Sequence, residues 1–372
     1  MSVRVLYILA NEPTGGVGVF VKDFTAHFSD QVSIDYLIYT EQRDTPFQKS
    51  VTKSDTRMYY LPELTVKNYL TLEHQTEAFF CSHQGEYPIV HLTYPGLVNL
   101  CGKPARKYGT RWVIIHSLNS RLSDDPLRSV RNKLLISNFR KTANCYLACS
   151  EEAAEYLYGK QMIRNHEVIF IHNAIDCDQY RFDQTIRDKV RKELGVSTKK
   201  LILMAGRLEK QKNISFGIKV FSELRKQDPD SFLMIIGDGP LKESLEKEAE
   251  SLNLSRDISF QSFTPKLNEL FMAADLLLFP SLYEGLPITV VDAENSGLPC
   301  LLSDTISREV QLTDCVRFCS LSESPSYWAQ QALSMMELPR KQRTEEITAG
   351  GYNILEESRK LEQLYLDLER KD

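Results

Sequence analysis

Two basic side chains stand where they could bind a diphosphate. Arg207 and Lys212 lie five residues apart, in a segment that follows a short apolar run and Gly206. A guanidinium offers a planar fork of donors and an ammonium a compact charge, so together they suit a diphosphate. Taken alone, an R-x4-K pattern is more often a solvated basic turn, and this interpretation therefore depends on further motifs.

A second segment combines a carboxylate with the start of a helix. In residues 279–293 a strand-like run precedes Glu284, and Pro287 suits the first turn of the helix that follows. Backbone N–H groups at a helix start attract anions. The groups expected to do so here belong to Gly285, Leu286 and Ile288. Asp292 comes about one turn into the helix, where its carboxylate would meet polar groups beyond the phosphates.

A glycine-rich segment near the N-terminus could also approach a phosphate. Gly15 and Gly16 lie in Thr-Gly-Gly-Val-Gly, residues 14–18, between a strand-like run and a helical one. Glycines allow the backbone to come close to a phosphate at a helix start. The third glycine of the dinucleotide fingerprint is lacking, and a tight turn explains the pattern equally well.

These segments belong to two series of alternating strand and helix patterns. Strand-like runs occupy 3–9, 33–38, 89–92, 112–116 and 145–148, and then 201–205, 232–236, 258–261, 276–279 and 299–302. Such alternation predicts parallel sheets with right-handed crossovers. We therefore predict an α/β protein with two Rossmann-like doubly wound domains facing across a cleft. In such sheets ligands bind at the carboxyl ends of the strands, where the three segments lie.

The domain boundary is predicted where the strand pattern pauses. Residues 178–194 are charged and lack a strand-like run, which favours domains at 1–180 and 181–355. Residues 356–372 are charged with an apolar stripe. We expect them to form a helix that packs back toward the first domain, because such a stripe needs a partner.

Together the three segments, in this order and spacing, resemble the retaining nucleotide-sugar glycosyltransferases of family 4, whose two Rossmann-like domains form the GT-B fold. Three further stretches are similar to motifs of that family. They are Ile-His-Asn-Ala-Ile-Asp at 171–176, Ile-Gly-Asp-Gly-Pro at 236–240 and Ile-Ile-His-Ser at 114–117. Within the family, the chain is most similar to the bacterial group that builds capsular polysaccharide and exopolysaccharide. The resemblance covers nearly the whole chain.

The resemblance implies a role for each candidate catalytic residue. Arg207 and Lys212 would hold the donor diphosphate and stabilise the leaving group as the bond to the sugar breaks. Glu284 would contact hydroxyls of the donor sugar, and Asp292 would bind the ribose. His116 would lie beside the donor sugar and the acceptor.

The resemblance also implies how the donor and acceptor are divided between the domains. The first domain would bind the acceptor and the second the nucleotide sugar. The remaining donor-binding positions are Gly15, Gly16, Gly237, Gly285, Leu286 and Ile288. Neither a metal ion nor a cofactor is implied, because cations and helix dipoles would do the work of a metal.

The chain departs from the family pattern at three positions. Asp292 stands where the family has a glutamate, which makes the carboxylate one methylene shorter. Glu294 cannot easily replace it, because two residues further on it lies about 200° around the helix. Ala174 and Ser262 replace glycines of the pattern. His91 is interpreted as structural or peripheral rather than as part of the site.

Charge is distributed unevenly along the chain. The net charge of −5 argues against a nucleic-acid binder, which is commonly basic. Residues 1–180 carry 19 basic and 19 acidic side chains, whereas 181–372 carry 26 and 31. Within the neutral part, residues 101–145 hold ten basic side chains against Asp124 and Asp125. Within this stretch a helix is expected over residues 126–141. Its basic side chains form either a solvated helix face or a surface that docks on an anionic membrane, and the two interpretations have equal weight.

The compartment is predicted from the apolar runs and the cysteines. No apolar run approaches the roughly 18 residues of a membrane span. Arg4 interrupts the first apolar run, which is therefore interpreted as a strand and not as a signal peptide. The eight cysteines lack the pattern of a metal site and are expected to be buried free thiols in a reducing cytosol. We therefore expect a cytoplasmic protein, peripheral on the inner face of the membrane if the basic stretch docks there.

The sequence therefore predicts a retaining hexosyltransferase. It would transfer a sugar from a nucleotide diphosphate sugar to a lipid-linked or growing saccharide of a bacterial surface polysaccharide. The expected donor is a UDP-sugar. Two alternatives on the same architecture stay open, namely a non-catalytic glycosyltransferase-like partner subunit and a sugar-nucleotide epimerase. The presence of Arg207, Lys212 and Glu284 favours the transferase over the partner subunit. Asp292, which departs from the family's glutamate, keeps the partner subunit as an alternative.

Overall fold

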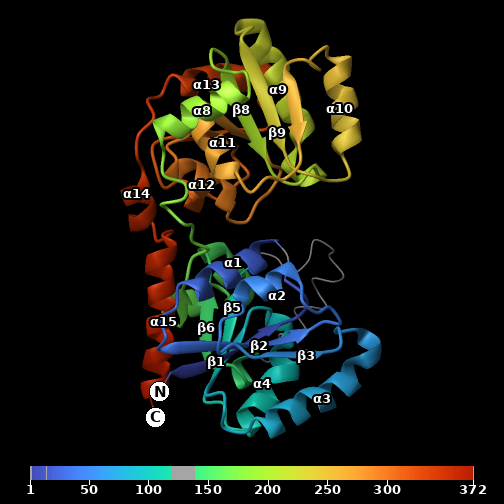
Figure 1. Cartoon of the computed structure of the whole chain (residues 1–372), viewed down its shortest axis with the longest axis vertical. Helices are drawn as coiled ribbons and strands as arrows, with labels where there is room; N and C mark the ends of the chain where they lie inside the picture. The colour runs from blue at the N-terminus through green and yellow to red at the C-terminus, as the bar shows by residue number, and fades with distance from the viewer. Residues whose placement is uncertain (1, 14, 119–138, 372) are drawn as a thin grey trace. The chain divides into compact units, whose positions relative to one another are not determined.

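The computed structural model describes residues 2–13, 15–118 and 139–371, which form two compact units (Figure 1). Unit 1 comprises Met1–Ala174 and Ile354–Asp372, and unit 2 comprises Ile175–Asn353. The first boundary lies before the expected position at 180. The second lies just before the expected one at 355, so that the whole last helix belongs to unit 1.

Unit 1 is built on a parallel sheet of seven strands in the order β3-β2-β1-β4-β5-β6-β7. The strands are β1 (Val3–Leu9), β2 (Val32–Tyr39), β3 (Met58–Leu61), β4 (Ile89–Leu92), β5 (Trp112–Ser117), β6 (Cys145–Ala148) and β7 (Val168–Phe170). Alternate residues of β1 enter two cores, with Tyr7 and Leu9 on one face and Leu6 and Ile8 on the other. Because both faces are buried, the strand is apolar without a break from Val5 to Leu9 rather than alternating.

Helices cover both faces of the unit 1 sheet. One face carries α1 (Gly15–Ala26), α2 (Pro46–Val51) and α15 (Ile354–Arg370). The other face carries α3 (Tyr69–Ser82), α4 (Val98–Lys107), α6 (Glu151–Tyr158) and α7 (Lys160–Arg164), and short 3₁₀ turns occur at Val66–Asn68, Pro95–Leu97 and Phe139–Lys141. The last helix, α15, contacts α1 and β1, the first elements of the chain (Figure 1). It thereby buries Leu361, Tyr365 and Leu368 of its apolar stripe.

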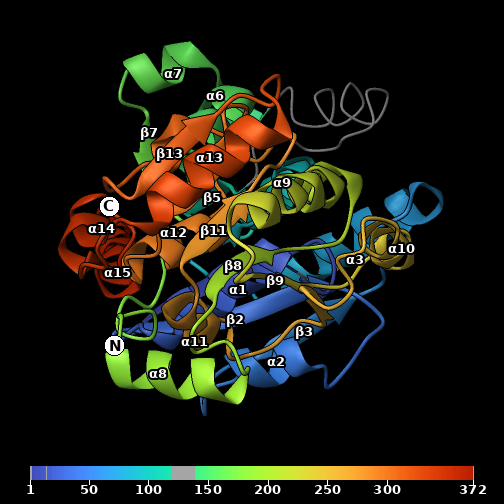
Figure 2. The same cartoon turned by 90° about the horizontal axis from the view of Figure 1, so that it is seen from above.

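Unit 2 is built on a parallel sheet of six strands in the order β10-β9-β8-β11-β12-β13. The strands are β8 (Lys200–Ala205), β9 (Ser231–Ile236), β10 (Ile258–Gln261), β11 (Leu276–Phe279), β12 (Cys300–Ser303) and β13 (Val316–Cys319). One face packs on α8 (Gln184–Glu193), α11 (Leu267–Ala273), α12 (Ile288–Asn295) and α14 (Thr344–Ala349). The other packs on α9 (Ile214–Gln227), α10 (Lys242–Ser251) and α13 (Pro325–Met336), of which α9 and α13 contact each other (Figure 2).

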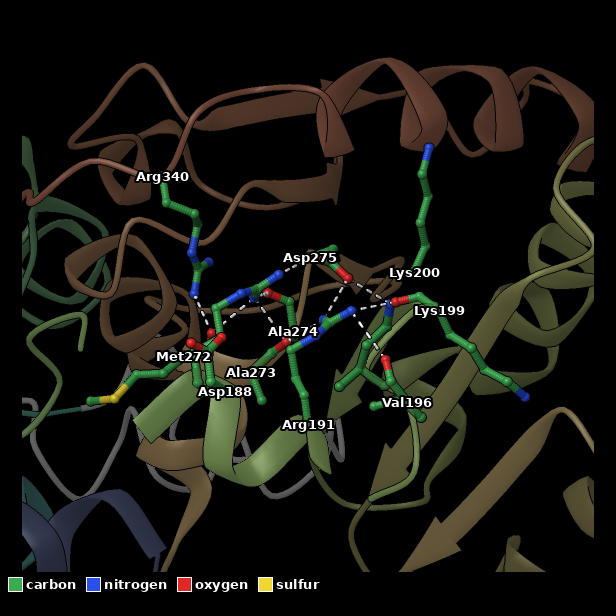
Figure 3. A network of polar contacts seen from close by, with 12 residues as sticks. Asp188, Arg191, Val196, Lys199, Lys200, Met272, Ala273, Ala274, Asp275 and Arg340 are labelled. Carbon is green, nitrogen blue, oxygen red and sulfur yellow. Dashed lines mark hydrogen bonds and ion pairs between the residues drawn. The ribbon is translucent and has the colours of Figure 1, made fainter. Parts of the chain in front are cut away.

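A polar network ties α8 to the end of α11 and the start of β11 (Figure 3). Both Arg187 and Arg191 of α8 pair with Asp275, and the Arg191 guanidinium lies 2.9 Å from the carboxylate. Arg187 also donates to the carbonyls of Met272, Ala273 and Ala274. The last carbonyls of α11 have no partner within their own helix, and these arginines supply one. The predicted charged boundary segment therefore contains a helix with a defined partner.

The structure confirms the predicted α/β class with two Rossmann-like units. Sequence reasoning missed β3 and β7, which are the two outer strands of the unit 1 sheet. These strands have only four and three residues, and most of their side chains are half-buried. All eight cysteines are free, but Cys81 is exposed, which contradicts the expectation that all of them are buried.

Candidate active site

The topology of unit 2 creates a place for a ligand between β8 and β11. The connection after β8 passes through α9 on one face of the sheet, whereas the connection after β11 passes through α12 on the other. Loops that leave neighbouring strands toward opposite faces form the usual ligand site of an open parallel sheet. The two loops here are residues 206–213 and 280–287, which contain most of the predicted site residues.

Hydrogen bonds fasten these two loops to each other. The Leu282 N–H donates to the Gln211 carbonyl at 2.8 Å, and the Gln211 side chain donates to the Tyr283 carbonyl at 3.0 Å. Asn213 adopts a left-handed conformation with φ of 52°, which asparagine tolerates well, and donates to the Pro280 carbonyl at 3.1 Å. Side chains on either loop are therefore held against the other loop.

Lys212 and Glu284 form an ion pair at this junction. The Lys212 Nζ lies 2.6 Å from the Glu284 Oε1, and the two side chains are only 17% and 9% exposed. The ammonium also lies 4.8 Å from the centre of the Phe279 ring. An ammonium has three donors and a carboxylate several acceptor positions. Each group can therefore keep this contact and still bind a phosphate oxygen or a sugar hydroxyl.

The Arg207 side chain is more exposed and more weakly held than that of Lys212. Its side chain is 66% exposed, and its guanidinium lies 3.2 Å from the carboxylate of Glu209. An exposed pair of this kind is worth about 0–1 kcal/mol. The guanidinium can therefore leave Glu209 for a bound anion at little cost.

Glycines allow the loop after β9 to lie against the loop after β8. Gly237 has φ of 151°, and a Cβ added to it would lie 1.9 Å from the carbonyl oxygen of Gly206. Gly239 is similarly constrained, because its Cβ would lie 2.5 Å from the carbonyl oxygen of Leu208. The predicted donor-binding residue Gly237 thus supports the backbone that carries Arg207.

The start of α12 completes the unit 2 site. The helix starts at Ile288, and Pro287 is its N-cap residue rather than part of the first turn. Gly285, Leu286 and Ile288 lie at this start, as the sequence indicated. Asp292 is 8% exposed, on the next turn of the same helix.

Glu294, which follows Asp292 on α12, serves a different purpose. It is completely buried and its Oε2 accepts hydrogen bonds from the backbone of Leu312 and from the backbone and hydroxyl of Thr313, at 2.7–3.2 Å. Burial raises the pKa of its carboxyl to about 8, although the bonds from Thr313 and Leu312 oppose the rise. Glu294 thus holds the segment before β13 and is not free to replace the missing glutamate.

In unit 1, the glycine-rich segment forms the start of α1. Gly15 and Gly16 are its first residues, and a Cβ on Gly16 would meet nothing within 4 Å. A Cβ on Gly18, in contrast, would lie 2.9 Å from the Pro13 carbonyl oxygen. Packing therefore requires a glycine at 18, whereas at 16 the space would accept a side chain.

His116 lies near the end of β5 and is completely buried. Its Nδ1 lies 3.2 Å from the Nε2 of His91 on β4, and Phe20 of α1 packs edge-on against its ring. Burial lowers the pKa of His116 to about 3, so its imidazole is neutral at pH 7. His91, interpreted from the sequence as structural or peripheral, is the direct partner of this predicted site residue.

Three further residues at the two sites were not singled out from the sequence. Gln211 donates to the Glu284 Oε2 at 3.3 Å, and Asp238 accepts from Ser262 at 2.8 Å in the loops that follow β9 and β10. Tyr365 contacts His91 in unit 1. Gln211 and Asp238 lie inside motifs that the sequence displays. Tyr365 lies far from His91 in the chain, and only its place in an apolar stripe was visible.

Two family descriptions match the chain, one in each part. Glycosyltransferase Family 4 matches residues 14–179, and Glycosyl transferases group 1 matches residues 186–350. The chain belongs to glycosyltransferase family 4. Its fold is the GT-B fold of these enzymes, as predicted.

Individual relatives of this glycosyltransferase agree with that assignment. EpsF of Bacillus subtilis (strain 168), assigned as a glycosyltransferase, is 29% identical over 336 residues, which are 88% of this chain and 86% of EpsF. The Escherichia coli UDP-Gal:alpha-D-GlcNAc-diphosphoundecaprenol alpha-1,3-galactosyltransferase is 23% identical over 301 residues, 76% of each chain. The crystal structure of Anabaena Alr3699/HepE in complex with UDP and glucose has a TM-score of 0.74 at 15% identity, covering 98% of this chain and 100% of that one.

The basic stretch of this glycosyltransferase lies only partly within the described residues. Its members outside them are Arg121, Arg128, Arg131 and Lys133, with most of the helix expected over 126–141. Among the described members, Lys107 pairs with Glu77 and Arg111 pairs with Glu369. These two side chains are therefore engaged within unit 1.

Over residues 2–13, 15–118 and 139–371, no helix is long and apolar enough to span a bilayer. In the same part of the chain, no three or more His, Cys, Asp and Glu side chains gather as ligands for a metal ion.

Proposed function

We propose that this glycosyltransferase transfers a hexose, with retention of anomeric configuration, from a UDP-sugar to a lipid-linked or growing saccharide of a bacterial surface polysaccharide. The observation that carries the proposal is the half-buried ion pair between Lys212 and Glu284, whose two loops also carry the exposed Arg207. In the proposed complex, the two cations bind the diphosphate and the carboxylate binds a sugar hydroxyl.

The choice of donor and acceptor is supported by the relatives. One of them is named for transfer of galactose from UDP-Gal to a saccharide on diphosphoundecaprenol, and a structure of the same fold holds UDP and glucose. In the proposed complex, Lys212 and Arg207 stabilise the charge that develops on the departing diphosphate, and Glu284 accepts from a hydroxyl of the hexose. Asp292 binds the ribose, and the N–H groups of Gly285, Leu286 and Ile288 face the phosphates. Gly237 supports the loop that carries Arg207.

The proposal includes a reaction without a divalent metal ion and with a direct front-face displacement. The acceptor hydroxyl attacks the anomeric carbon on the side from which the diphosphate leaves. Its proton passes to the departing phosphate oxygen, and the sugar–phosphate bond breaks. His116, from unit 1, donates to an oxygen of the sugar in this arrangement, and Gly15 and Gly16 allow the acceptor to approach the start of α1.

A donor panel tests the proposal. The purified protein is incubated with a polyprenyl-diphosphate saccharide and, in turn, UDP-glucose, UDP-galactose, UDP-N-acetylglucosamine, GDP-mannose and ADP-glucose, and products are identified by mass. Transfer from one UDP-sugar, unchanged by EDTA, is expected, with an axial or equatorial product linkage that matches the donor when read by NMR. Thermal shifts with UDP, GDP and ADP accompany the panel, because a ligand that binds the folded state raises its melting temperature.

Matched variants assign the chemistry to the site. Lys212→Ala and Glu284→Ala are expected to lower kcat at least about 10²-fold, the typical loss of one transition-state donor. Lys200→Ala and Glu337→Ala remove a comparable lysine–glutamate pair, 2.9 Å long, from the exposed surface of the same unit, and should retain full activity. Wild-type rates in Lys212→Ala would refute the site. A lack of any nucleotide shift or transfer would instead favour the partner subunit.

Contact with the membrane forms a separate part of the proposal. We expect the basic residues 126–141 to bring the protein to anionic lipid, where each basic side chain contributes about 1 kcal/mol. Sedimentation with vesicles of phosphatidylglycerol and phosphatidylcholine tests it. Reversal of the charges at Arg128, Arg131 and Lys133 should abolish sedimentation, and unchanged binding would show that this stretch is a solvated surface.

A further inference from the structure

A continuous row of four buried polar rings crosses unit 1. The Tyr7 hydroxyl lies 2.7 Å from that of Tyr365, which lies 2.6 Å from the Nδ1 of His91. The Nε2 of His91 lies in turn 3.2 Å from the Nδ1 of His116. All four side chains have no exposed surface. These groups therefore exchange protons and hydrogen bonds with one another and not with bulk water.

The fold holds the four rings in fixed positions. Tyr7, His91 and His116 lie on the adjacent strands β1, β4 and β5, and the rings of Tyr7 and His91 are stacked with centres 4.5 Å apart. Tyr365 comes from α15, which is also anchored to β5 by a 2.8 Å bond from the Trp112 indole to the Leu368 carbonyl. The last helix of the chain thus places the Tyr365 hydroxyl against the central strands β1 and β4 of the unit 1 sheet.

Counting donors gives the row a direction. Both histidines are neutral, because burial holds the pKa of each well below its usual value. If each hydrogen points from Tyr7 toward His116, then Tyr7 donates to Tyr365, Tyr365 to the His91 Nδ1, and the His91 Nε2–H to the His116 Nδ1. The His116 proton is then on Nε2, which makes no well-formed hydrogen bond among the described residues, although the ring also interacts with the Ile171 backbone.

The opposite direction leaves more groups unsatisfied. The Tyr7 hydroxyl hydrogen would then need another acceptor, and within the part of the chain that the structure describes its hydroxyl has only Tyr365 as a partner. The His116 Nε2 would again be unpartnered, now as an acceptor. A buried polar group without its hydrogen bond costs about 1–3 kcal/mol, so the first direction is favoured by the cost of one such group.

We propose that Tyr365 acts through His91 to fix the tautomer of His116, with its proton on Nε2, so that this nitrogen can only donate a hydrogen bond. Tyr365 is thus a positioning residue. The consequence for catalysis rests on the proposed function, in which the Nε2–H of His116 donates to an oxygen of the bound sugar. A ring held in one tautomer is ready to donate without rearrangement when the sugar binds.

Nitrogen NMR of the full chain tests the tautomer directly. Of the seven histidines, His91 and His116 are assigned in ¹⁵N-histidine-labelled protein by the loss of their signals in single His→Gln variants. In the wild type, both rings are expected to carry the proton on Nε2 and to have a bare Nδ1. A proton on the Nδ1 of His116 would overturn the proposal, whatever any variant does.

Two matched variants test the role of Tyr365. Tyr365→Phe and Tyr7→Phe each remove one buried hydroxyl from the same row. Tyr7→Phe removes only the first donor and should leave both tautomers and kcat within about twofold of the wild type. Tyr365→Phe removes the donor to His91, so both directions become accessible and the His116 nitrogen signals should move toward averaged positions. We expect kcat to fall about 10–100-fold, by analogy with metal-binding histidines that lose the outer partner that orients them, with the donor KM within twofold.

The outcomes separate this proposal from the proposed function. Equal effects of the two variants would show a general packing loss and would refute the positioning role, as would unchanged tautomers in Tyr365→Phe. The expected tautomers together with no transfer from any donor would refute the proposed function and leave the action of Tyr365 on His116 in place. Circular dichroism of both variants checks that each remains folded.

Discussion

Replacement of Gly237 by alanine tests how the loop after β9 is held against the loop after β8. The added Cβ would lie 1.9 Å from the carbonyl oxygen of Gly206 and 2.9 Å from its carbonyl carbon. Contacts below 3.0 Å are essentially never seen for a Cβ, so the backbone itself must move. The φ of 151° adds strain, since side chains rarely adopt it.

The size of the effect follows from these two contributions. Backbone strain of this kind costs about 1–3 kcal/mol, and the overpacking costs about another 1–3 kcal/mol. We therefore expect Gly237→Ala to lower the free energy of unfolding of unit 2 by about 3 kcal/mol or more. At about 2–4 °C per kcal/mol for a domain of this size, the melting temperature should fall by at least about 6 °C.

Gly195 provides the matched control. It also has a positive φ, of 67°, but a Cβ there would meet nothing within 4 Å. Gly195→Ala should therefore cost only the strain of the left-handed conformation, about 1–2 kcal/mol. The difference between the two variants isolates the clash with the Gly206 carbonyl from the conformational penalty that both share.

Urea denaturation measures both variants in a background that reports unit 2 alone. The chain has two tryptophans, Trp112 in unit 1 and Trp328 buried in unit 2. In Trp112→Phe protein, the fluorescence of Trp328 follows unit 2. Stabilisation by UDP should survive in Gly195→Ala and be reduced in Gly237→Ala, because Arg207 follows the displaced Gly206. Equal stability of the two variants, or equal stabilisation by UDP, would refute the argument.

Three further outcomes follow from buried or exposed groups. Burial would raise the pKa of Asp275, but Arg187, Arg191 and the Leu201 N–H hold it below its usual value. Asp275→Asn should therefore lower the free energy of unfolding by about 3 kcal/mol at pH 7. Urea titrations of this variant should also show a smaller loss of stability as pH falls below about 4. Burial raises the pKa of Glu294 to about 8. The free energy of unfolding of the wild type should therefore decrease by a few kcal/mol as pH rises from about 5 to 8. Glu294→Gln keeps an acceptor for Thr313 and should not show this decrease. Cys81 is the exposed thiol among eight free ones, so a thiol reagent should modify one cysteine in the native protein and eight in urea, and rapid modification of several would contradict the structure.

The unit 2 site could be predicted from the sequence because its residues are close together in the chain. Arg207 and Lys212 share one strand-to-helix loop, and Glu284 lies in the other loop that follows a neighbouring central strand. Parallel sheets bring such loops to one edge, and this rule needs only the strand pattern. The direct contact between Lys212 and Glu284, and the role of Gln211 in joining the loops, depend on the exact turn of each backbone, which the pattern does not encode.

The unit 1 site was less predictable because its contacts join distant parts of the chain. Tyr365 was visible only as one member of an apolar stripe, and its hydroxyl gains meaning only when α15 packs against β1 and β4. The glycine-rich segment combines two kinds of glycine. Gly16 stays a predicted binding residue with open space around it, whereas Gly18 packs against Pro13, which the sequence did not indicate.

The two units place their polar groups according to the same rule, although the groups differ. In unit 1, β1 lies between β2 and β4, and Tyr7 and His91 pair in register across the β1–β4 boundary. In unit 2, β8 lies between β9 and β11, and Lys212 and Glu284 come from the loops after β8 and β11. In unit 2 the polar groups lie in the loops, where a large anion can reach them. In unit 1 they lie inside the sheet, without exposed surface, and orient one another through hydrogen bonds. The topology thus accounts for where both sets of groups lie. Their degree of burial accounts for the difference between them: the loop residues of unit 2 are suited to bind a charged ligand, and the buried rings of unit 1 are suited to fix a single hydrogen-bond donor.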